Sequence, residues 1–234
     1  MYKYRAEITK GEEVRYISHL DYAGVIQRAI CRAHLPAAYS EGFNPHMKMA
    51  FASALAMGVT SDKEYMDFEM ARPLNAQEVM DRLNAHLPQG VRILRIKPVR
   101  EFKNKKKHKS LMAEVDLADY ELFMPLEGDW DKAVESVQEF NQLKEYVYHR
   151  VTPKKVRDIE IKQYIKEPVK ISMSGDRLKL EMSIIITQTG TIKSSDILKI
   201  LAEEFGLPIN PVRALINRKL CMAKARLLLT WCKA

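Results

Sequence analysis

The first part of the chain shows two different periodicities of apolar residues. Residues 2–10 alternate between apolar and polar side chains and include tyrosine and isoleucine, which predicts a β-strand that residues 15–17 continue or re-enter. From Ser18 onward, apolar residues recur at helical spacing, which predicts a helix. We expect Pro36 to close this helical region, because proline cannot continue the backbone hydrogen bonding of a helix.

The following stretch predicts two strands, a helix and another strand. Residues 47–54 and 63–70 have the composition of strands, with a turn between them. Asn75 is a candidate N-cap of a helix that Pro88 stops, and residues 91–99 form the next strand. The resulting order, β-α-β-β-α-β, is that of a ferredoxin-like domain, in which two helices cover one face of the sheet and leave the other open.

The second half of the chain also mixes strands and helices, without a clear sequence repeat of the first half. The same rules predict strand-like residues 111–126, a helix over 129–143 capped by Asp129 and a strand over 145–151. They next predict a hairpin around 174–176 and a helix over 194–206 capped by Ser194. A further helix is expected to start at Asn210-Pro211, followed by a last strand over 224–231.

These patterns predict an α+β fold with two domains. Residues 1–99 form a ferredoxin-like domain, residues 100–110 a basic linker, and residues 111–234 a second α+β domain, for which a second ferredoxin-like unit is one option. No apolar run approaches the length of about 18 residues that a membrane span needs, and the chain opens on a charged segment. We therefore expect a cytoplasmic protein without a membrane partner.

Positive charge is concentrated in one short segment. The chain has a formal net charge of +8 and a sequence pI of about 9.3. Residues 100–109, here called the basic strip, hold six basic side chains and one acidic side chain. Such a strip is typical of a polyanion-binding surface and equally of a solvated linker. Its candidate RNA-contacting lysines are Lys103, Lys105, Lys106, Lys107 and Lys109.

Several kinds of chemistry find no support in the sequence. Cys31, Cys221 and Cys232 are far apart and odd in number, which argues against a disulfide framework or a zinc ribbon. The histidines lack metal-ligand spacing, and neither a phosphate-binding glycine loop nor a serine-triad motif is present. We expect neither a metal nor a cofactor.

The segment "YSEGFNPHMKMAF" at residues 39–51 is the strongest candidate for a binding loop. Gly42 and Asn44-Pro45 have the chemistry of a turn and need no ligand to explain them. Tyr39 and His46 are less well explained, and a neutral histidine on an amide-rich loop suits an anionic or base-like ligand. The candidate RNA-contacting residues of this loop are Tyr39, Ser40, Phe43, Asn44 and His46.

A second candidate lies in the segment "SHLD" at residues 18–21. Ser18 and Asp21 fit a capping box, which explains both without a function. His19 would then be partly exposed at the start of the helix, where it is a candidate general base or base-stacking group. Arg28 and Arg32 follow one turn apart, and they either grip phosphate or form a solvated face.

The same segments carry a resemblance to a known family. "ISHLD" and "AYSEGFNPHMKMAFASALAMGVTSDKEYMDFEM" resemble the bacterial radical SAM-linked family of uncharacterised proteins, and "KKVRDIEIKQYI", which contains Asp158, resembles a shorter element of it. Members occur alone or fused to a radical SAM protein. The resemblance implies work beside a separate radical SAM enzyme and, through the usual genomic company of the family, near RNA. This chain lacks the cysteine motif of a radical-generating cluster.

Three functional hypotheses follow. The favoured one is an RNA-binding accessory protein that presents an RNA or ribonucleoprotein substrate to a separate radical SAM enzyme. The second is a metal-free RNA-processing or RNA-modifying enzyme in which His19 or His46 acts as general acid or base. The third is a pure protein-interaction subunit that docks on the enzyme through an open sheet face.

Overall fold

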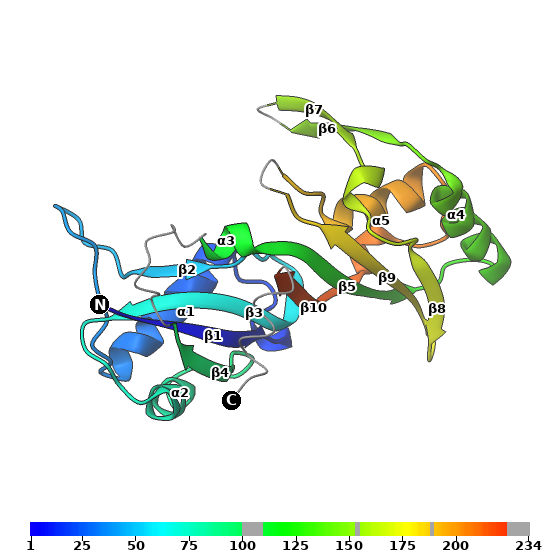
Figure 1. The fold of residues 1–234 in the computed structure, drawn as a ribbon. Helices are drawn as coiled ribbons and strands as arrows, with labels where there is room; N and C mark the ends of the chain where they lie inside the picture. Colours follow the sequence, from blue (N-terminus) through cyan, green and yellow to red (C-terminus); the bar gives the residue numbers. More distant parts are fainter. Residues whose placement is uncertain (100–109, 153–154, 188–189, 224–234) are drawn as a thin grey trace. The chain divides into compact units, whose positions relative to one another are not determined.

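The structure is a computed structural model that describes residues 1–99, 110–152, 155–187 and 190–223. The described residues form an α+β fold with five α-helices (Figure 1). The chain divides into two compact units, of which unit 1 contains Met1–Val115 and unit 2 contains Asp116–Met222. Among the described helices, none is both long enough and apolar enough to cross a membrane.

Unit 1 contains the predicted alternation of strands and helices. Its elements are β1 (Tyr2–Lys10), η1 (Glu12–Val14, a 3-10 helix), α1 (His19–Arg32), β2 (Met49–Phe51), β3 (Val59–Met70), α2 (Ala76–Asn84), β4 (Ile93–Pro98) and α3 (Leu111–Glu114). The strands lie in the order β4-β1-β3-β2, and each neighbouring pair is antiparallel.

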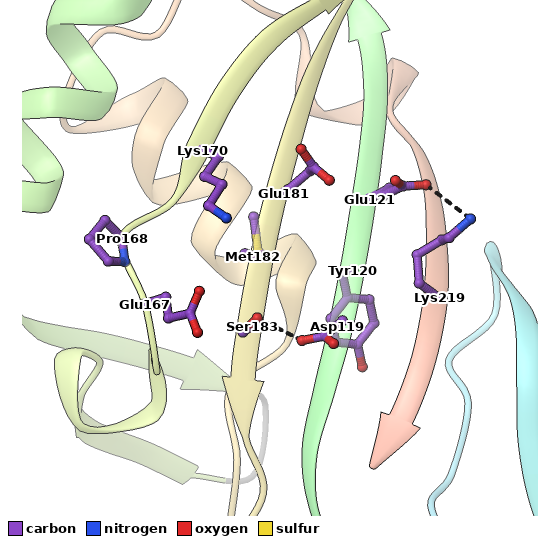
Figure 2. A pocket seen from close by; sticks show the side chains of 10 residues that line it. All are labelled: Asp119, Tyr120, Glu121, Glu167, Pro168, Lys170, Glu181, Met182, Ser183 and Lys219. Atoms are coloured by element: carbon purple, nitrogen blue, oxygen red, sulfur yellow. Dashed lines mark hydrogen bonds and ion pairs between the residues drawn. The ribbon is translucent and has the colours of Figure 1, made fainter.

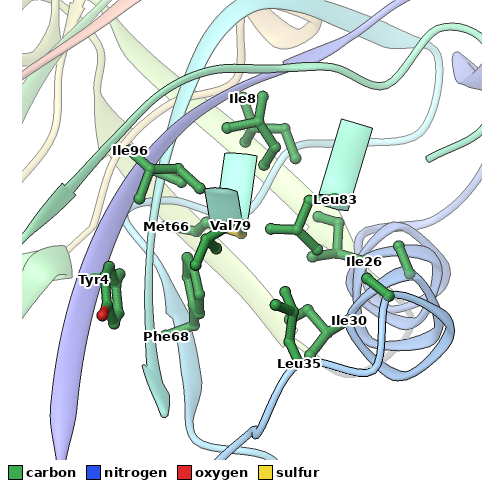
Figure 3. Packing of buried hydrophobic residues seen from close by; sticks show 14 of the residues in the cluster. Tyr4, Ile8, Ile26, Ile30, Leu35, Met66, Phe68, Val79, Leu83 and Ile96 are labelled. Carbon is green, nitrogen blue, oxygen red and sulfur yellow. The ribbon is translucent and has the colours of Figure 1, made fainter. Parts of the chain in front are cut away.

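The core of unit 1 forms between one face of this sheet and the helices α1 and α2 (Figure 3). Ile26 and Ile30 of α1 and Leu83 of α2 are almost fully buried against Ile8 of β1 and Phe68 of β3. Helical spacing points the apolar residues of α1 and α2 toward the sheet, and strand alternation points Ile8 and Phe68 toward the helices. These side chains therefore meet in one apolar layer. Burial of this apolar surface is what holds the two helices on the sheet.

Several predicted strand boundaries in unit 1 are wrong. The strand expected over 47–54 is only the three residues of β2, and residues 111–114, expected as strand, form the helix α3. Residues 15–17 are not a strand, because the carbonyls of Arg15 and Ile17 accept hydrogen bonds from the Lys10 amino group instead of joining a ladder. The strand expected from residue 63 begins at Val59, where Ser61 pairs with Lys10 across the sheet. Long-range pairing therefore overrides the turn preference of the Ser-Asp sequence.

Unit 2 builds a sheet of the same kind and adds a separate hairpin. Its elements are β5 (Val115–Pro125), α4 (Trp130–Gln142), β6 (Val147–Thr152), β7 (Lys155–Glu160), η2 (Lys162–Tyr164), β8 (Lys170–Ser174), β9 (Arg177–Ile185), α5 (Ser194–Glu203), η3 (Pro211–Arg213) and β10 (Leu215–Ala223). The main strands lie in the order β10-β5-β9-β8, and β6 and β7 pair only with each other.

The caps of unit 2 follow the sequence in part. Asp129 caps α4 through its carboxylate, which accepts hydrogen bonds from the backbone N–H groups of Asp131 and Lys132. Ser194 is not a cap, since it is the first residue of α5 and is buried. Asn210-Pro211 starts only a 3-10 turn, and the strand expected over 224–231 lies outside the described residues.

The strand β10 was not predicted, because its sequence "LINRKLCMA" mixes basic and apolar residues without a clean alternation. The predicted division into domains at 1–99 and 111–234 stays a prediction, and most of the linker assigned to 100–110 lies outside the described residues.

Candidate nucleic-acid interface

The loop that was singled out from the sequence forms a narrow hairpin-like projection in unit 1, here called the 38–48 loop. Backbone hydrogen bonds join the two sides of its stem, from Lys48 N–H to the Ala38 carbonyl (2.8 Å) and from Ser40 N–H to the His46 carbonyl (2.8 Å). The Ser40 hydroxyl also accepts a hydrogen bond from His46 N–H at 2.9 Å. These hydrogen bonds hold the two sides of the stem together and fix both ends of the tip at residues 41–45.

The tip of the 38–48 loop points its polar and aromatic groups at solvent. Phe43 is fully exposed, and Asn44 and His46 are exposed as well. Gly42 has φ +122°, a conformation that a side chain would oppose, so a glycine is required at this point of the turn. A fully exposed phenylalanine gains nothing for the fold of unit 1, which makes it available for a ligand.

Tyr39 stands at the base of the same loop. Its side chain is about half exposed, at 47%, and it lies near the exposed Cys31 at the end of α1. Partial burial, with a smaller contribution from the charge and hydrogen bonding of Cys31, raises the pKa of Tyr39. The phenol is therefore neutral at physiological pH and presents a flat ring beside a hydroxyl donor.

The "SHLD" segment starts α1 largely as predicted. The Ser18 hydroxyl accepts a hydrogen bond from Asp21 N–H at 3.1 Å and donates one to the Asp21 carboxylate at 2.6 Å. The carboxylate thus reaches the hydroxyl rather than the backbone of the cap residue. His19 is half-buried and packs edge-on against Phe51, with ring centroids 4.9 Å apart. Packing explains the position of this imidazole without a catalytic role.

The two arginines of α1 have different surroundings. Arg32 donates to the His86 carbonyl, just beyond the end of α2, at 2.7 Å. Arg82 of α2 reciprocates by donating to the carbonyls of Ala33 and His34 at the end of α1. Arginines here satisfy carbonyls that a helix end leaves unpaired. Arg28 is exposed and, among the described residues, has no hydrogen bond or ion pair.

The structure therefore places the described contact residues on two features, the 38–48 loop and α1. Tyr39, Ser40, Phe43, Asn44 and His46 lie together on one loop of unit 1, His19, Arg28 and Arg32 lie along α1, and Lys103, Lys105, Lys106, Lys107 and Lys109 lie outside the described residues.

A charged pocket in unit 2 was missed by the sequence reading (Figure 2). It has a volume of about 290 Å³ and lies on the sheet of β5, β8, β9 and β10. Lys179 bridges Glu121 at 2.8 Å and Glu181 at 3.1 Å, two carboxylates that face each other across β5 and β9. Ser183 donates to Asp119 at 2.6 Å. The alternating acids Asp119 and Glu121 of β5 were the signal that could have revealed this surface.

The β6–β7 hairpin carries a second unpredicted pair. His149 Nδ1 lies 2.7 Å from a carboxylate oxygen of Asp158, and both side chains are exposed. The two residues face each other in the antiparallel register. In the sequence, His149 and Asp158 lie equally far on either side of the dipeptide Pro153-Lys154. A prediction of a hairpin with its turn at this dipeptide would therefore have paired the two residues. Among the described residues, no group of three or more histidine, cysteine or acidic side chains is arranged to hold a metal ion.

Comparisons with known proteins add a family and a fold likeness. A family model described as "Uncharacterized protein conserved in bacteria (DUF2344)" matches residues 3–194. The search of the curated proteins found no match.

Two solved structures are similar in fold at low identity. A chain of "Crystal Structure of a Cbf5-Nop10-Gar1 Complex" matches with 11% identity and a TM-score of 0.51, covering 94% of this chain and 50% of that chain. This protein thus spans about half the length of that relative, and at this identity the likeness shows the fold alone. A chain of "Crystal Structure of an Unknown Protein from Galdieria sulphuraria" matches with 11% identity over 93% of this chain and 96% of that chain, and its TM-score of 0.28 carries no argument.

The family match extends from β1 of unit 1 to the first residue of α5 in unit 2. Because it spans most of the chain and both units, this protein belongs to the DUF2344 family of uncharacterized proteins conserved in bacteria.

Proposed function

We propose that this protein is an RNA-binding accessory protein that presents an RNA or ribonucleoprotein substrate to a separate radical SAM enzyme. The observation that carries the proposal is the 38–48 loop, whose tip exposes Phe43, Asn44 and His46 on a stem ordered by its own backbone bonds. Single-stranded RNA is recognised by aromatic stacking and by hydrogen bonds to unpaired base edges, and these three side chains offer both.

Charge supports an RNA partner. The formal net charge of +8 includes the excess of five positive charges in the basic strip, whose lysines supply sequence-independent attraction to phosphate in this proposal. Arg28 adds an exposed guanidinium on α1. Arg32 contributes less than its sequence position suggested, because its guanidinium already binds the His86 carbonyl.

The architecture is consistent with this role. We propose that unit 1 and unit 2 are both ferredoxin-like. Apart from the short helix α3 and the β6–β7 hairpin, each has two α-helices and four strands in the sheet order last-first-third-second. The radical SAM enzyme as partner rests on the family resemblance of the "ISHLD" and "YSEGFNPHMKMAF" segments. The cytoplasmic location rests on the sequence alone.

The test is RNA retention with the full chain. Purification from native cells at low salt, followed by sequencing of bound RNA, is expected to recover a defined RNA. Replacement of Phe43 and Asn44 by alanine should weaken binding of that RNA at least tenfold, since one lost stacking contact alone is worth about 1–3 kcal/mol. Val212→Ala, an exposed apolar change in unit 2, is the matched control. RNA retention that does not fall with rising salt would contradict the proposal.

The enzymatic alternative remains a separate proposal with its own test. It assigns general acid or base chemistry to His19 or His46, of which His46 is exposed and His19 packs on Phe51. His46→Ala should then abolish turnover of the bound RNA and spare its binding, whereas the accessory function predicts no turnover by the isolated wild-type chain.

A further inference from the structure

The side chains at the tip of the 38–48 loop do not hold the loop together. The amide of Asn44, which the sequence suggested as part of the turn, makes no hydrogen bond to the described residues. The ring of Phe43 has no ring contact among them, and His46 bonds to the Ser40 hydroxyl only through its backbone N–H. The positive φ of Gly42 accounts for the turn without them. A phenyl ring, an amide and an imidazole are therefore free to contact a ligand.

The tip has no lysine or arginine that could attract phosphate. None lies between residues 39 and 47, and the one acidic side chain there, Glu41, is exposed and has no ion pair among the described residues. The first basic residue after the tip, Lys48, lies at the foot of the stem, 3.9 Å from the Glu69 carboxylate. An unpaired carboxylate repels phosphate groups. The tip is therefore poorly matched to the phosphate-lined surface of an RNA duplex.

The chemistry of the tip fits unpaired bases. In an A-form duplex the faces of the bases are covered by their neighbours, and proteins recognise such a duplex mostly through its shape, 2′-hydroxyls and phosphates. The ring of Phe43 can stack only on a base that has left the helical stack, as in a loop, a bulge or a single-stranded end. The Asn44 amide offers both donors and an acceptor, which the exposed edge of an unpaired base requires.

A second aromatic ring and a cation lie at the foot of the loop. Tyr39, 47% exposed, is hydrogen-bonded to Cys31 of α1. Arg28 lies three residues before Cys31 on the same helix, a spacing that makes the two neighbours on the helix surface. Its guanidinium lies over Gly24, where a β-carbon would be 3.2 Å from Nη1. A phosphate donor is therefore available on α1, beside the loop rather than in it.

We propose that the 38–48 loop binds unpaired RNA nucleotides through their bases, while Arg28 on α1 contacts the phosphate. Tyr39 and Phe43 stack on bases, and Asn44 and His46 bond to base edges. This inference rests on the proposed RNA-binding function and adds the substrate class: an RNA loop, bulge or single-stranded end. A protein segment is less well matched, because the tip offers one apolar ring and no contiguous apolar surface.

The first test compares single-stranded with duplex RNA. The full chain is titrated at low salt with a fluorescein-labelled single strand of about twelve nucleotides of randomised sequence, and with a labelled duplex of about twelve base pairs. We expect the single strand to bind at least tenfold more tightly. Equal affinities, or tighter binding of the duplex, would overturn the proposal.

Salt dependence then separates base contacts from phosphate contacts. Phe43→Ala should weaken binding of the single strand about fivefold or more, and Asn44→Ala about threefold, each without changing the slope of log K against log salt concentration. Arg28→Ala should reduce that slope by about 0.7, the contribution of one phosphate on a single strand. Lys63→Ala, at an exposed position of β3, is the matched control and should change neither quantity. A slope that changes with Phe43→Ala but not with Arg28→Ala would contradict the assignment.

Failure of this inference can be told from failure of the proposed function. If the wild-type chain binds neither the single strand nor the duplex, the RNA function itself is lost. If it binds RNA and Phe43→Ala leaves the affinity unchanged, with a urea midpoint equal to the wild type, the RNA function stands and the base-binding loop is refuted. A protein that copurifies with the wild type and is lost in Phe43→Ala, while RNA binding is retained, would assign the loop to protein docking instead.

Discussion

Unit 1 and unit 2 each carry an insertion at the same point of the fold, between the first helix and the second strand. In unit 1 the insertion is the 38–48 loop, which separates α1 from β2. In unit 2 it is the β6–β7 hairpin, which separates α4 from β8 (Figure 1). The two insertions differ in what holds them.

The 38–48 loop is held through its backbone. Ala38 N–H donates to the Glu69 carbonyl, and Glu69 N–H donates to the Lys48 carbonyl, so the stem continues the pairing of β3. Backbone hydrogen bonds form with almost any side chain, so the side chains at the tip can be those that a ligand requires. A change of side chain in this loop should alter binding before it alters stability.

The base of the β6–β7 hairpin is held by one backbone bond, from Ile161 N–H to the Tyr146 carbonyl at 3.0 Å, and by several side-chain contacts. The Glu160 carboxylate accepts hydrogen bonds from the backbone N–H groups of Tyr146 (2.8 Å) and Lys162 (3.0 Å). The Lys162 amino group donates to the Phe140 carbonyl and lies over the Phe140 ring, and burial lowers its pKa. Single substitutions should therefore disturb the position of this hairpin, in contrast to the loop of unit 1.

The largest loss is expected at a third connection, where one side chain holds the residues between β1 and α1. Lys10→Met removes the fully buried amino group that donates to the carbonyls of Arg15, Ile17 and Ala56. We expect the free energy of unfolding to fall by about 3 kcal/mol in urea denaturation. Lys63→Met, at an exposed position of β3, should change it by less than about 0.5 kcal/mol. Equal effects of the two changes would refute this role of Lys10.

The next effect is expected at the β6–β7 hairpin. Glu160→Ala leaves two backbone N–H groups without their acceptor and should cost about 2 kcal/mol. Glu160→Gln keeps a carbonyl oxygen at the same place and should cost about half as much. Hydrogen exchange of the Tyr146 and Lys162 amides should accelerate in the alanine variant. Unchanged exchange would show that the hairpin is not held by this carboxylate.

A smaller and pH-dependent effect is expected at Lys179, which pairs with Glu121 and Glu181 of the charged pocket. The hydrogen bond to Glu121, followed by weaker contributions from Glu181, raises the pKa of Lys179 against the effect of burial. A raised folded-state pKa adds stability that is complete below the ordinary value of 10.5 and is lost as pH rises through the folded value.

Lys179→Met should therefore cost about 1 kcal/mol at pH 8, because Glu181 then faces Glu121 without Lys179 between them, and Glu121 keeps only its ion pair with Lys219. The difference between variant and wild type should shrink in urea titrations above pH 10.5. Lys199→Met, which removes an exposed pair with Glu203 on α5, is the control and should cost less than about 0.5 kcal/mol. A deficit that grows with alkaline pH would contradict the assignment.

The smallest effect is expected in the 38–48 loop. Ser40→Ala removes the hydroxyl that accepts from His46 N–H, while the backbone bond from Ser40 N–H to the His46 carbonyl remains. We expect a loss of about 0.5 kcal/mol and faster hydrogen exchange at the His46 amide. Phe43→Ala should leave stability unchanged. A loss above about 1.5 kcal/mol in either variant would show that side chains do hold this loop.

The sequence by itself determined the helices α1, α2 and α4 and their starts. Ser18, Asn75 and Asp129 were predicted as N-caps, and in the structure each accepts a hydrogen bond from the first turn of its helix. The hairpin turn at Gly175, which has φ +63°, was also predicted. These features depend on residues within about four positions of each other, so local preferences suffice to define them. The exposed tip of the 38–48 loop follows from its turn residues in the same way.

Only the tertiary structure decided the features that join distant segments. The strand β10, the register that sets Glu121 opposite Glu181, and the contact of the buried Lys10 with the Ala56 carbonyl each need a partner tens of residues away. A lysine reads as a surface residue in the sequence, and only the folded chain supplies the carbonyls that make its burial favourable. The exposure of Tyr16, Leu20 and Met57 has the same origin. From the sequence alone, apolar residues are predicted to be buried, and only the packing of the helices on the sheet shows which of them stay exposed.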